Sequence, residues 1–232
     1  MRISNKGLRL CLVAAAFGAA AVLPAARADD GQITVSISEG KKIFQNGKES
    51  VSPCQSCHGE NGLGMDAMQT PRLANVGYAY IVKQLTVEDR RNVAAYLNTL
   101  EMKSEPSDLV ALKAGGTEVG DPYKGLVLVR YGVLGKAPAC QSCHGYNGRG
   151  ADPIYPAIGQ QKYVYLVNQL KRWRDGSRAN DPIGMMRAVA KNLSDEDIYN
   201  AAAYLSRAPK STVGDGFVPS NQSVLENLNL VH

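Results

Sequence analysis

The sequence CQSCH occurs twice in this chain, from Cys54 to His58 and from Cys140 to His144. Two thiols on one turn can each form a thioether with a haem vinyl group, and the histidine that follows can supply an imidazole nitrogen to the iron. A tethered haem also provides apolar surface around which a short domain can build its core. The duplicated motif therefore predicts two small domains, each folded around one covalently attached haem c.

The cysteine pairs could also form vicinal disulfides or bind zinc, but the histidines argue against both. The chain has five cysteines, of which four lie in the two motifs, and three histidines, of which two directly follow a cysteine pair. A zinc site made of four thiolates would not need a histidine at that position. The residues that we assign to covalent attachment are Cys54, Cys57, Cys140 and Cys143, and the axial histidines are His58 and His144.

The first 28 residues have the features of a secretory signal peptide. A positively charged start precedes an apolar run of 14 residues, Leu10–Leu23, and small residues stand at Ala26 and Ala28. That run is shorter than the roughly 20 residues needed to span a bilayer. We therefore predict cleavage after Ala28 and a periplasmic location. The mature chain is expected to have no transmembrane segment, because no later apolar stretch is long enough.

The formal charge argues against a nucleic-acid binder. It is +5 for the whole chain, and four cationic but no acidic residues leave with the signal peptide, so that +5 minus 4 gives +1 for the mature protein. The propionates of bound haem would lower this charge further. A basic surface that attracts nucleic acid is therefore not expected.

The chain is an internal duplication whose two copies differ in length. The motif and the residues after it match at an offset of 86, Tyr80–Leu85 matches Tyr165–Leu170 at 85, and Ala94–Leu97 matches Ala202–Leu205 at 108. The first copy therefore lacks 23 residues (108 minus 85), which correspond to Lys171–Leu193 of the second. This missing segment is the main difference between the two predicted domains.

The hydrophobic periodicity predicts three or four helices in each copy and no persistent strand beyond the alternation at Ile33–Ile37, so the expected fold class is all-α. Helices are expected before each motif, after the loop that follows it, and at the end of each copy. Ser194 with Asp197, and Thr86 with Asp89, mark the starts of the final helices as approximate capping boxes. The other predicted helices are Glu39–Asn46, Tyr123–Tyr131, Tyr78–Leu85 and Tyr163–Trp173.

The second copy offers a methionine for the far side of its haem. In electron-transfer cytochromes a methionine thioether opposite the histidine stabilises reduced iron. Met185 and Met186 lie between the predicted helix Tyr163–Trp173 and the capped final helix, where a chain that wraps the haem would pass. Either methionine could instead fill a core, which is the ordinary role of an isolated methionine.

These features resemble the diheme cytochromes c4 and their relatives among the class I c-type cytochromes. The resemblance covers about residues 38–207 and rests on three patterns: CQSCHG followed by Asn-Gly-x-Gly in both copies, Gly159-Gln160-Gln161-x-Tyr163, and Met186-x6-Leu193-Ser194-x-Glu196-Asp197. It implies two tandem class I cytochrome c domains that pass electrons between redox partners. In this family the axial methionine stands seven residues before the leucine that opens the last helix, which selects Met186 as the ligand of the second haem.

The resemblance also implies which residues surround the haems. Pro71-Arg72-Leu73 and Pro156-Ala157-Ile158 would each place a proline and an aliphatic residue against a haem. Trp173 would pack beside the second haem or its propionates, with which Arg174 and Arg178 could pair.

The first copy departs from the family, because the segment that would carry its axial methionine is missing. Met65 and Met68, in the loop after the first motif, are the preferred replacements, although a loop methionine could equally pack against the haem edge. Met102 and the terminal His232 are further candidates. A five-coordinate iron is the remaining alternative.

The predicted function is electron transfer without catalysis by this chain. It would act as a soluble shuttle or as the cytochrome subunit of a dehydrogenase, with a periplasmic dehydrogenase, another cytochrome or a terminal oxidase as its redox partner. The alternative is a haem enzyme or ligand sensor with an open site at the first haem, for which the sequence supplies no distal machinery. The expected organisation is a signal peptide at 1–28, a shortened first domain at 29–102, a linker at 103–120, a second domain at 121–208 and a tail at 209–232.

Overall fold

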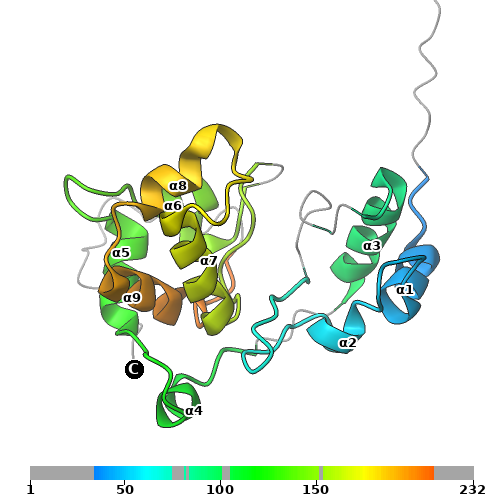
Figure 1. The fold of residues 1–232 in the computed structure, drawn as a ribbon, viewed down its shortest axis with the longest axis horizontal. Helices are drawn as coiled ribbons and strands as arrows, with labels where there is room; N and C mark the ends of the chain where they lie inside the picture. The colour runs from blue at the N-terminus through cyan, green and yellow to red at the C-terminus, as the bar shows by residue number, and fades with distance from the viewer. Residues whose placement is uncertain (1–33, 75–80, 82–83, 101–104, 152–153, 212–232) are drawn as a thin grey trace, which may run out of the picture. The chain divides into compact units, whose positions relative to one another are not determined.

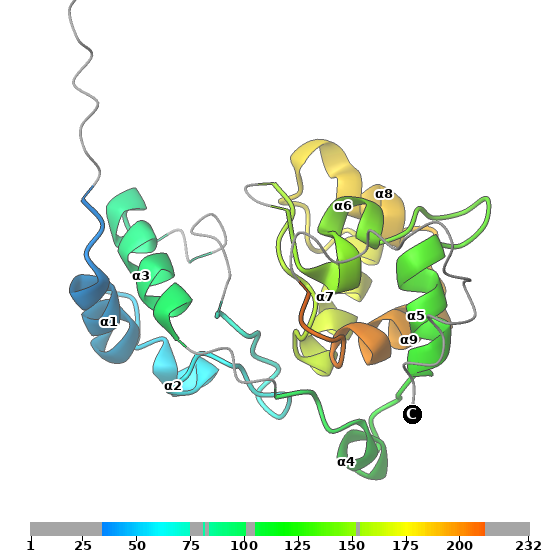
Figure 2. The same cartoon turned by 180° about the vertical axis from the view of Figure 1, so that it is seen from behind.

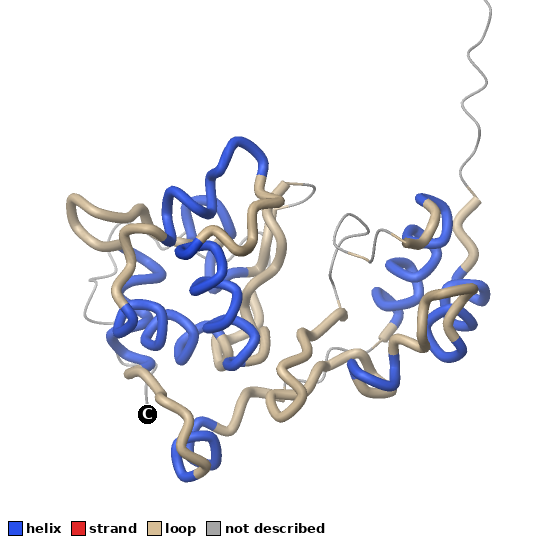
Figure 3. The backbone as a smooth tube through the Cα atoms, viewed as in Figure 1, coloured by secondary structure: helices blue, strands red, loops and turns tan. Residues whose placement is uncertain are grey.

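The structure is a computed structural model that describes residues 34–74, 81, 84–100, 105–151 and 154–211. The predicted signal peptide and most of the predicted tail lie outside these residues. Within the described part of the chain, the regular elements are helices, and the loops between them contain only isolated β-bridges (Figure 3). The prediction of an all-α protein is confirmed for these residues.

The first repeat is built on two helices that cross at a glycine. Helices α1 (Ile37–Asn46) and α3 (Val87–Thr99) pack against each other, and α2 (Gln55–His58) is the short helix of the first motif (Figures 1 and 2). A Cβ atom on Gly40 of α1 would lie 1.9 Å from the backbone oxygen of Asn92 in α3. Only glycine therefore permits the two helices to approach this closely.

The second repeat contains the corresponding crossing between α5 and α9. A Cβ atom on Gly125 would lie 1.9 Å from the backbone oxygen of Asn200. Gly125 and Gly40 are 85 residues apart, and Asn200 and Asn92 are 108 apart, which are the offsets of the repeat. The helices of this repeat are α5 (Pro122–Tyr131), α6 (Gln141–His144), η2 (Tyr146–Gly148), α7 (Tyr163–Asp175), η3 (Pro182–Gly184), α8 (Met185–Ala190) and α9 (Asp195–Leu205).

The two asparagines at these crossings also fix the start of the opposite helix. Asn92 Oδ1 accepts a hydrogen bond from Ser36 N at 2.8 Å, and Asn200 Oδ1 accepts one from Asp121 N at 2.7 Å. Ser36 and Asp121 are the N-cap residues of α1 and α5. Both repeats therefore contain the same set of contacts: a glycine at the helix crossing, and an asparagine that bonds to the N-cap residue of the opposite helix.

Each crossing carries an apolar core of its own. In the first repeat the rings of Phe44 and Tyr96 lie 5.5 Å apart between α1 and α3. In the second repeat Val129, Tyr163 and Ile198 are fully buried where α5, α7 and α9 meet.

The predicted starts of the two final helices are confirmed. Thr86 caps α3 by accepting from Asp89 N at 3.1 Å. Ser194 caps α9 in the same way, and the carboxylate of Asp197 accepts a hydrogen bond from Ser194 N at 2.9 Å. Both helices therefore begin where the capping pattern places them.

The helix predicted at Tyr78–Leu85 is wrong for the residues that the structure describes. Ile81, Gln84 and Leu85 lie in turns and bends rather than in a helix. Their counterpart α7 runs on to Asp175, and the last part of α7 belongs to the segment that the first repeat lacks. A helix shortened in this way gains too few hydrogen bonds to offset its nucleation. The alternation at Ile33–Ile37 also forms no strand in its described part, because Ile37 begins α1.

The segment predicted as a linker contains a short helix, α4 (Leu109–Ala114), which Asp108 caps. Leu109 is buried in the core of the second repeat. Glu118 O accepts a hydrogen bond from the Tyr163 hydroxyl at 2.8 Å, and Ser107 Oγ accepts from Tyr163 N at 2.9 Å. Much of the segment between the repeats is therefore packed against the second repeat.

Candidate haem-binding sites

The histidine of the second motif is oriented by a proline carbonyl. His144 is 7% exposed at the end of α6, and its Nδ1 donates a hydrogen bond to Pro156 O at 2.8 Å. That bond fixes the ring and leaves Nε2 free to bind a metal. Burial lowers the pKa of His144, although the hydrogen bond to Pro156 acts in the opposite direction. The lowered pKa favours the neutral imidazole, the form that binds metals.

The first motif holds its histidine in the same way. His58 Nδ1 donates a hydrogen bond to Pro71 O at 2.8 Å. Pro71 and Pro156 are 85 residues apart, the offset of the repeat. Burial also lowers the pKa of His58. The two histidines are therefore prepared as ligands by equivalent partners.

The glutamine within each motif ties it to the helix before it, a role that the sequence analysis missed. Gln55 Nε2 donates to Gln45 O at the end of α1, and Gln141 Nε2 donates to Arg130 O near the end of α5, each at 2.9 Å. The signal was present in the sequence, because glutamine recurs at the same motif position in both repeats. These bonds fix the cysteines relative to the helical frame.

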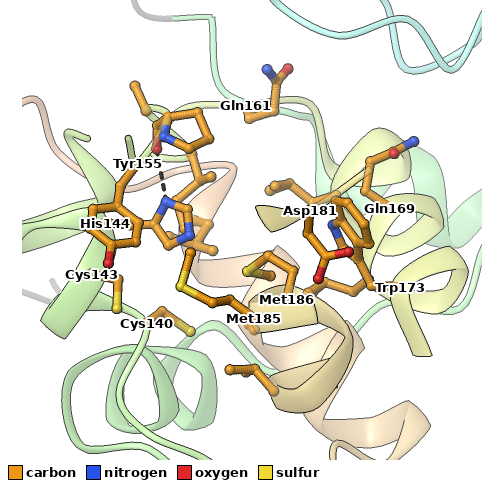
Figure 4. Close-up of a pocket in the computed structure, with 18 of the residues that line it drawn as sticks. Cys140, Cys143, His144, Tyr155, Gln161, Gln169, Trp173, Asp181, Met185 and Met186 are labelled. Carbon is orange, nitrogen blue, oxygen red and sulfur yellow. Dashed lines mark hydrogen bonds between the residues drawn. The ribbon is translucent and has the colours of Figure 1, made fainter. Parts of the chain in front are cut away.

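The second motif opens into a pocket that also receives both candidate methionines. Cys140, Cys143 and His144 line it from one side, and Met185 and Met186 line it from the first turn of α8. Figure 4 shows both methionine side chains inside the pocket with His144 and the cysteines. The structure thus brings the predicted ligands together. It places Met185 and Met186 in the same pocket without separating their roles.

The rest of the pocket suits a flat apolar group with polar edges. Burial raises the pKa of the Cys140 thiol to about 11, so that it stays neutral until it is alkylated. The Tyr155 ring lies edge-on to the His144 ring, with centroids 6.0 Å apart. Two thiols, one imidazole and two thioethers on apolar walls fit a covalently bound haem. The apolar residues that line the pocket include Ile158, Leu166, Leu170, Val189, Leu193, Ala201 and Leu205.

Of the two arginines expected near the propionates, Arg178 lines this pocket, and Arg174 does not appear in its lining. Arg178 stacks on Trp173 at 4.1 Å from the ring centroid, and its Nη1 donates to Gln169 Oε1 at 2.6 Å. Arg174 instead pairs with Asp195 and donates to a backbone carbonyl at 3.1 Å. Trp173 and Arg178 therefore form a stacked pair at one edge of the pocket.

Residues of the first repeat contribute to the same pocket. Pro71, Arg72 and Leu73 line it together with the residues of the second repeat. These residues were expected beside a haem, but nothing in the sequence indicated that it would be the haem of the other repeat. Comparison of the repeats could not reveal this, because it aligns Pro71-Arg72-Leu73 with Pro156-Ala157-Ile158 and carries no information on contacts between the two copies.

Met65 and Met68, the preferred ligand candidates of the first repeat, lie in the loop after the first motif. Met65 is half-buried, and its backbone pairs with Thr70 in a tight loop. Met68 is 50% exposed. Neither residue lines the pocket around His144. Met102 and His232 lie outside the described residues, so the sixth ligand of the first haem stays a prediction.

The described helices include none that is long and apolar enough to cross a membrane.

Comparisons with known proteins identify related cytochromes. A family model described as cytochrome c matches residues 134–209, the region of the second motif and its pocket. The protein named thiosulfate dehydrogenase electron acceptor from Stutzerimonas stutzeri is 30% identical over 195 residues, covering 76% of this chain and 89% of the relative. Cytochrome c4 from Thiocapsa roseopersicina is 34% identical over 164 residues, covering 66% and 85%.

Two solved structures share the fold. The chain superposes on thiosulfate dehydrogenase (TsdBA) from Marichromatium purpuratum with a TM-score of 0.62 and 28% identity, covering 75% of this chain and 40% of that one. Reduced recombinant cytochrome c4 from Pseudomonas stutzeri gives a TM-score of 0.60 and 26% identity, with 76% of this chain and 100% of that one covered. The chain belongs to the cytochrome c4 family of class I c-type cytochromes, electron-transfer proteins that bind haem c covalently.

Proposed function

We propose that this chain is a periplasmic two-haem cytochrome that accepts single electrons from a thiosulfate dehydrogenase or a similar periplasmic dehydrogenase. The observation that carries the proposal is the match to the Stutzerimonas stutzeri electron acceptor along most of both chains. The likeness to a structure titled thiosulfate dehydrogenase supports it further, although this chain spans only 40% of that one.

The residues of the second repeat support a carrier rather than an enzyme. Haem c supplies reversible one-electron chemistry when it is bound. Cys140 and Cys143 would hold it, His144 would bind the iron on one side, and Met186 is the proposed ligand on the other. A methionine in that position closes the iron to substrates and raises its reduction potential. The apolar walls of the pocket would limit the access of water to a bound haem.

The proposed haem site of the first repeat differs from that of the second. His58 bonds to Pro71 as His144 bonds to the equivalent Pro156, but the first repeat lacks the segment that corresponds to α8. We propose Met65 or Met68 as the sixth ligand there, since both lie in the loop after the motif. A face without its distal segment also provides room for a catalytic partner, which favours the role of a dehydrogenase subunit over that of a free shuttle.

The test is electron transfer between purified proteins. The holoprotein, with both haems attached and oxidised, is mixed with a thiosulfate dehydrogenase and thiosulfate in a stopped-flow instrument. We expect both haems to be reduced at a rate that saturates with the dehydrogenase concentration. The control omits the dehydrogenase, and dithionite then gives the full reduction amplitude. If dithionite reduces both haems but the dehydrogenase does not, the proposed partner is wrong.

Carbon monoxide tests the alternative of an open first haem. A carrier with two six-coordinate haems should show no spectral change when carbon monoxide is added to the reduced protein. A change that amounts to one haem per chain would instead favour the ligand sensor or haem enzyme. Met65→Ala and Met68→Ala then identify the ligand, because only the true ligand's loss should create such a binding site.

A further inference from the structure

The side chain of Arg72 extends from the first repeat into the pocket wall of the second. Only 5% of Arg72 is exposed. Its Nη2 donates a hydrogen bond to Gly159 O at 2.8 Å, and its Nη1 donates to Gln160 Oε1 at 3.2 Å. The same arginine lines the pocket that contains His144. A cation from one repeat thus reaches the cofactor site of the other.

This cation has no anionic partner among the described residues. None of the ion pairs in this part of the chain includes Arg72. Its Nε is buried and makes no hydrogen bond to a described residue. Burial lowers the pKa of Arg72 to about 10, since the oxygens around it are neutral. An unpaired buried charge is costly, so a missing anion is the natural explanation.

Other arginines do not share this combination of features. Arg130 also has a buried Nε without a hydrogen bond, but its guanidinium lies over the Tyr146 ring at 4.8 Å and it does not line the pocket. Arg178 lines the pocket, but it is stacked on Trp173. The position equivalent to Arg72 in the second repeat is Ala157. The buried cation is therefore a feature of one repeat only.

We propose that Arg72 is the counter-ion of a propionate carboxylate on the haem attached at Cys140 and Cys143. Haem carries its carboxylates at the edge of an otherwise apolar ring, and an arginine with a free Nε–H is a strong donor to such a group. Gln161 fixes the arginine backbone, because Arg72 N donates to Gln161 Oε1 at 2.6 Å and Gln161 Nε2 donates to Arg72 O at 3.0 Å. The first repeat thus supplies a charge that acts on the haem of the second.

The electrostatic consequence has a definite sign. Oxidised iron carries one more positive charge than reduced iron, so a buried cation nearby favours the reduced form. Removing the cation should lower the reduction potential of the second haem. It should also raise the pKa of the unpaired propionate, so that this potential comes to depend on pH near neutrality. The inference rests on haem attachment at the second motif and not on the identity of the redox partner.

The test is a spectroelectrochemical titration of the full-length holoprotein at several pH values, without any partner protein. Met185→His and Met186→His first identify the wave of the second haem, because exchange of its methionine lowers its potential. Arg72→Met and Arg72→Gln then remove the charge, and glutamine keeps a polar N–H group on a shorter side chain. Arg72→Lys retains the charge. Arg172→Met removes an exposed cation from the same repeat as the haem and serves as the matched control.

We expect Arg72→Met and Arg72→Gln to lower the potential of the second haem and to make it pH-dependent. Arg72→Lys should restore most of the potential, and Arg172→Met should leave it unchanged. Arg178, Asp181, Tyr155 and Tyr165 also line the pocket, but they are the same in all these proteins and their titration cancels in the comparison. An unchanged, pH-independent potential in Arg72→Gln overturns the proposal, even if Arg72→Met fails to fold.

Discussion

The side-chain amide of Gln161 forms two hydrogen bonds with the backbone of Arg72: it accepts from Arg72 N at 2.6 Å and donates to Arg72 O at 3.0 Å. This pairing resembles one rung of a β-ladder, and it joins residues that are 89 positions apart. Both residues are buried. The oxygen of Gln161 also accepts from Lys162 N at 2.9 Å, at the start of α7. One amide thereby connects the two repeats and orders a helix that lines the haem pocket.

Replacing Gln161 with alanine should therefore destabilise the contact between the repeats. Two buried N–H groups and one carbonyl would lose their partner, at a cost of about 2–3 kcal/mol. Thermal unfolding of the holoprotein, followed by circular dichroism, measures the loss. The matched control is Asn168→Ala, which removes an exposed hydrogen bond of 2.9 Å to Gln69 across the same contact and should cost less than about 0.5 kcal/mol. Equal effects of both variants would contradict the interpretation.

The glycines at the two helix crossings should not tolerate any side chain. In Gly125→Ala the new methyl group would meet the Asn200 oxygen at 1.9 Å, so α5 and α9 would have to move apart. We expect a loss of about 3 kcal/mol or more and a lower yield of haem-loaded protein. Gly115→Ala is the control, because its nearest neighbour would lie at 3.4 Å. Normal stability of Gly125→Ala would show that the crossing is looser than the structure indicates.

The two methionines of α8 should differ in their effect on the iron. Met186→Ala should abolish the methionine-to-iron charge-transfer band of one oxidised haem, and Met185→Ala should leave that band intact. Absorption spectra in the red region make the comparison directly. The reverse result would assign the ligand to Met185, which lines the same pocket.

Acid should weaken the first repeat through Asp89. Burial alone would raise the pKa of Asp89, but hydrogen bonds from Lys48, at 2.8 Å, and Thr86 outweigh it and hold the pKa below its ordinary value. A carboxylate with a lowered pKa contributes stability above its unfolded pKa, and this contribution is lost as the pH falls through the folded pKa. Lys48→Met should move the acid-unfolding midpoint to higher pH.

Two further variants place this effect at Asp89. Asp89→Asn should flatten the acid dependence of stability while also weakening the cap of α3, because an amide does not ionise. Lys42→Met removes a lysine that pairs with Glu39 at 3.4 Å on the surface and should leave the acid midpoint in place. A Lys48→Met protein with the parent midpoint would show that the pair contributes nothing to acid stability.

Local signals in the sequence were sufficient for part of the helical frame. The caps at Thr86 and Ser194 follow from short patterns whose physical cause is nearby in the chain, whereas the choice of Met186 rests on the family resemblance. A capping serine, for instance, needs only the three residues after it. The structure confirms the caps and brings Met186 into the pocket of His144.

The parts that could not be predicted depend on distant partners. The segment Tyr78–Leu85 shares an apolar pattern with the start of α7, but it lacks the residues through which α7 continues to Asp175, and its described residues are not helical. Arg72 lies in the pocket wall of the second repeat because it bonds to Gly159 and Gln161. Sequence periodicity within one repeat cannot predict contacts with the other repeat. Only the packing of the folded chain supplies this information.

The crossings at Gly40 and Gly125 have a consequence for how such a protein can diverge after duplication. Both copies retain the same glycine, asparagine and N-cap contacts, although only one retains the segment that carries Met185 and Met186. The helix crossing is therefore present in both repeats, with or without the segment that carries the two methionines. A duplicated domain of this kind can therefore lose a ligand-bearing segment from one copy and keep its helical crossing, so the two copies can diverge in sequence without a change of frame.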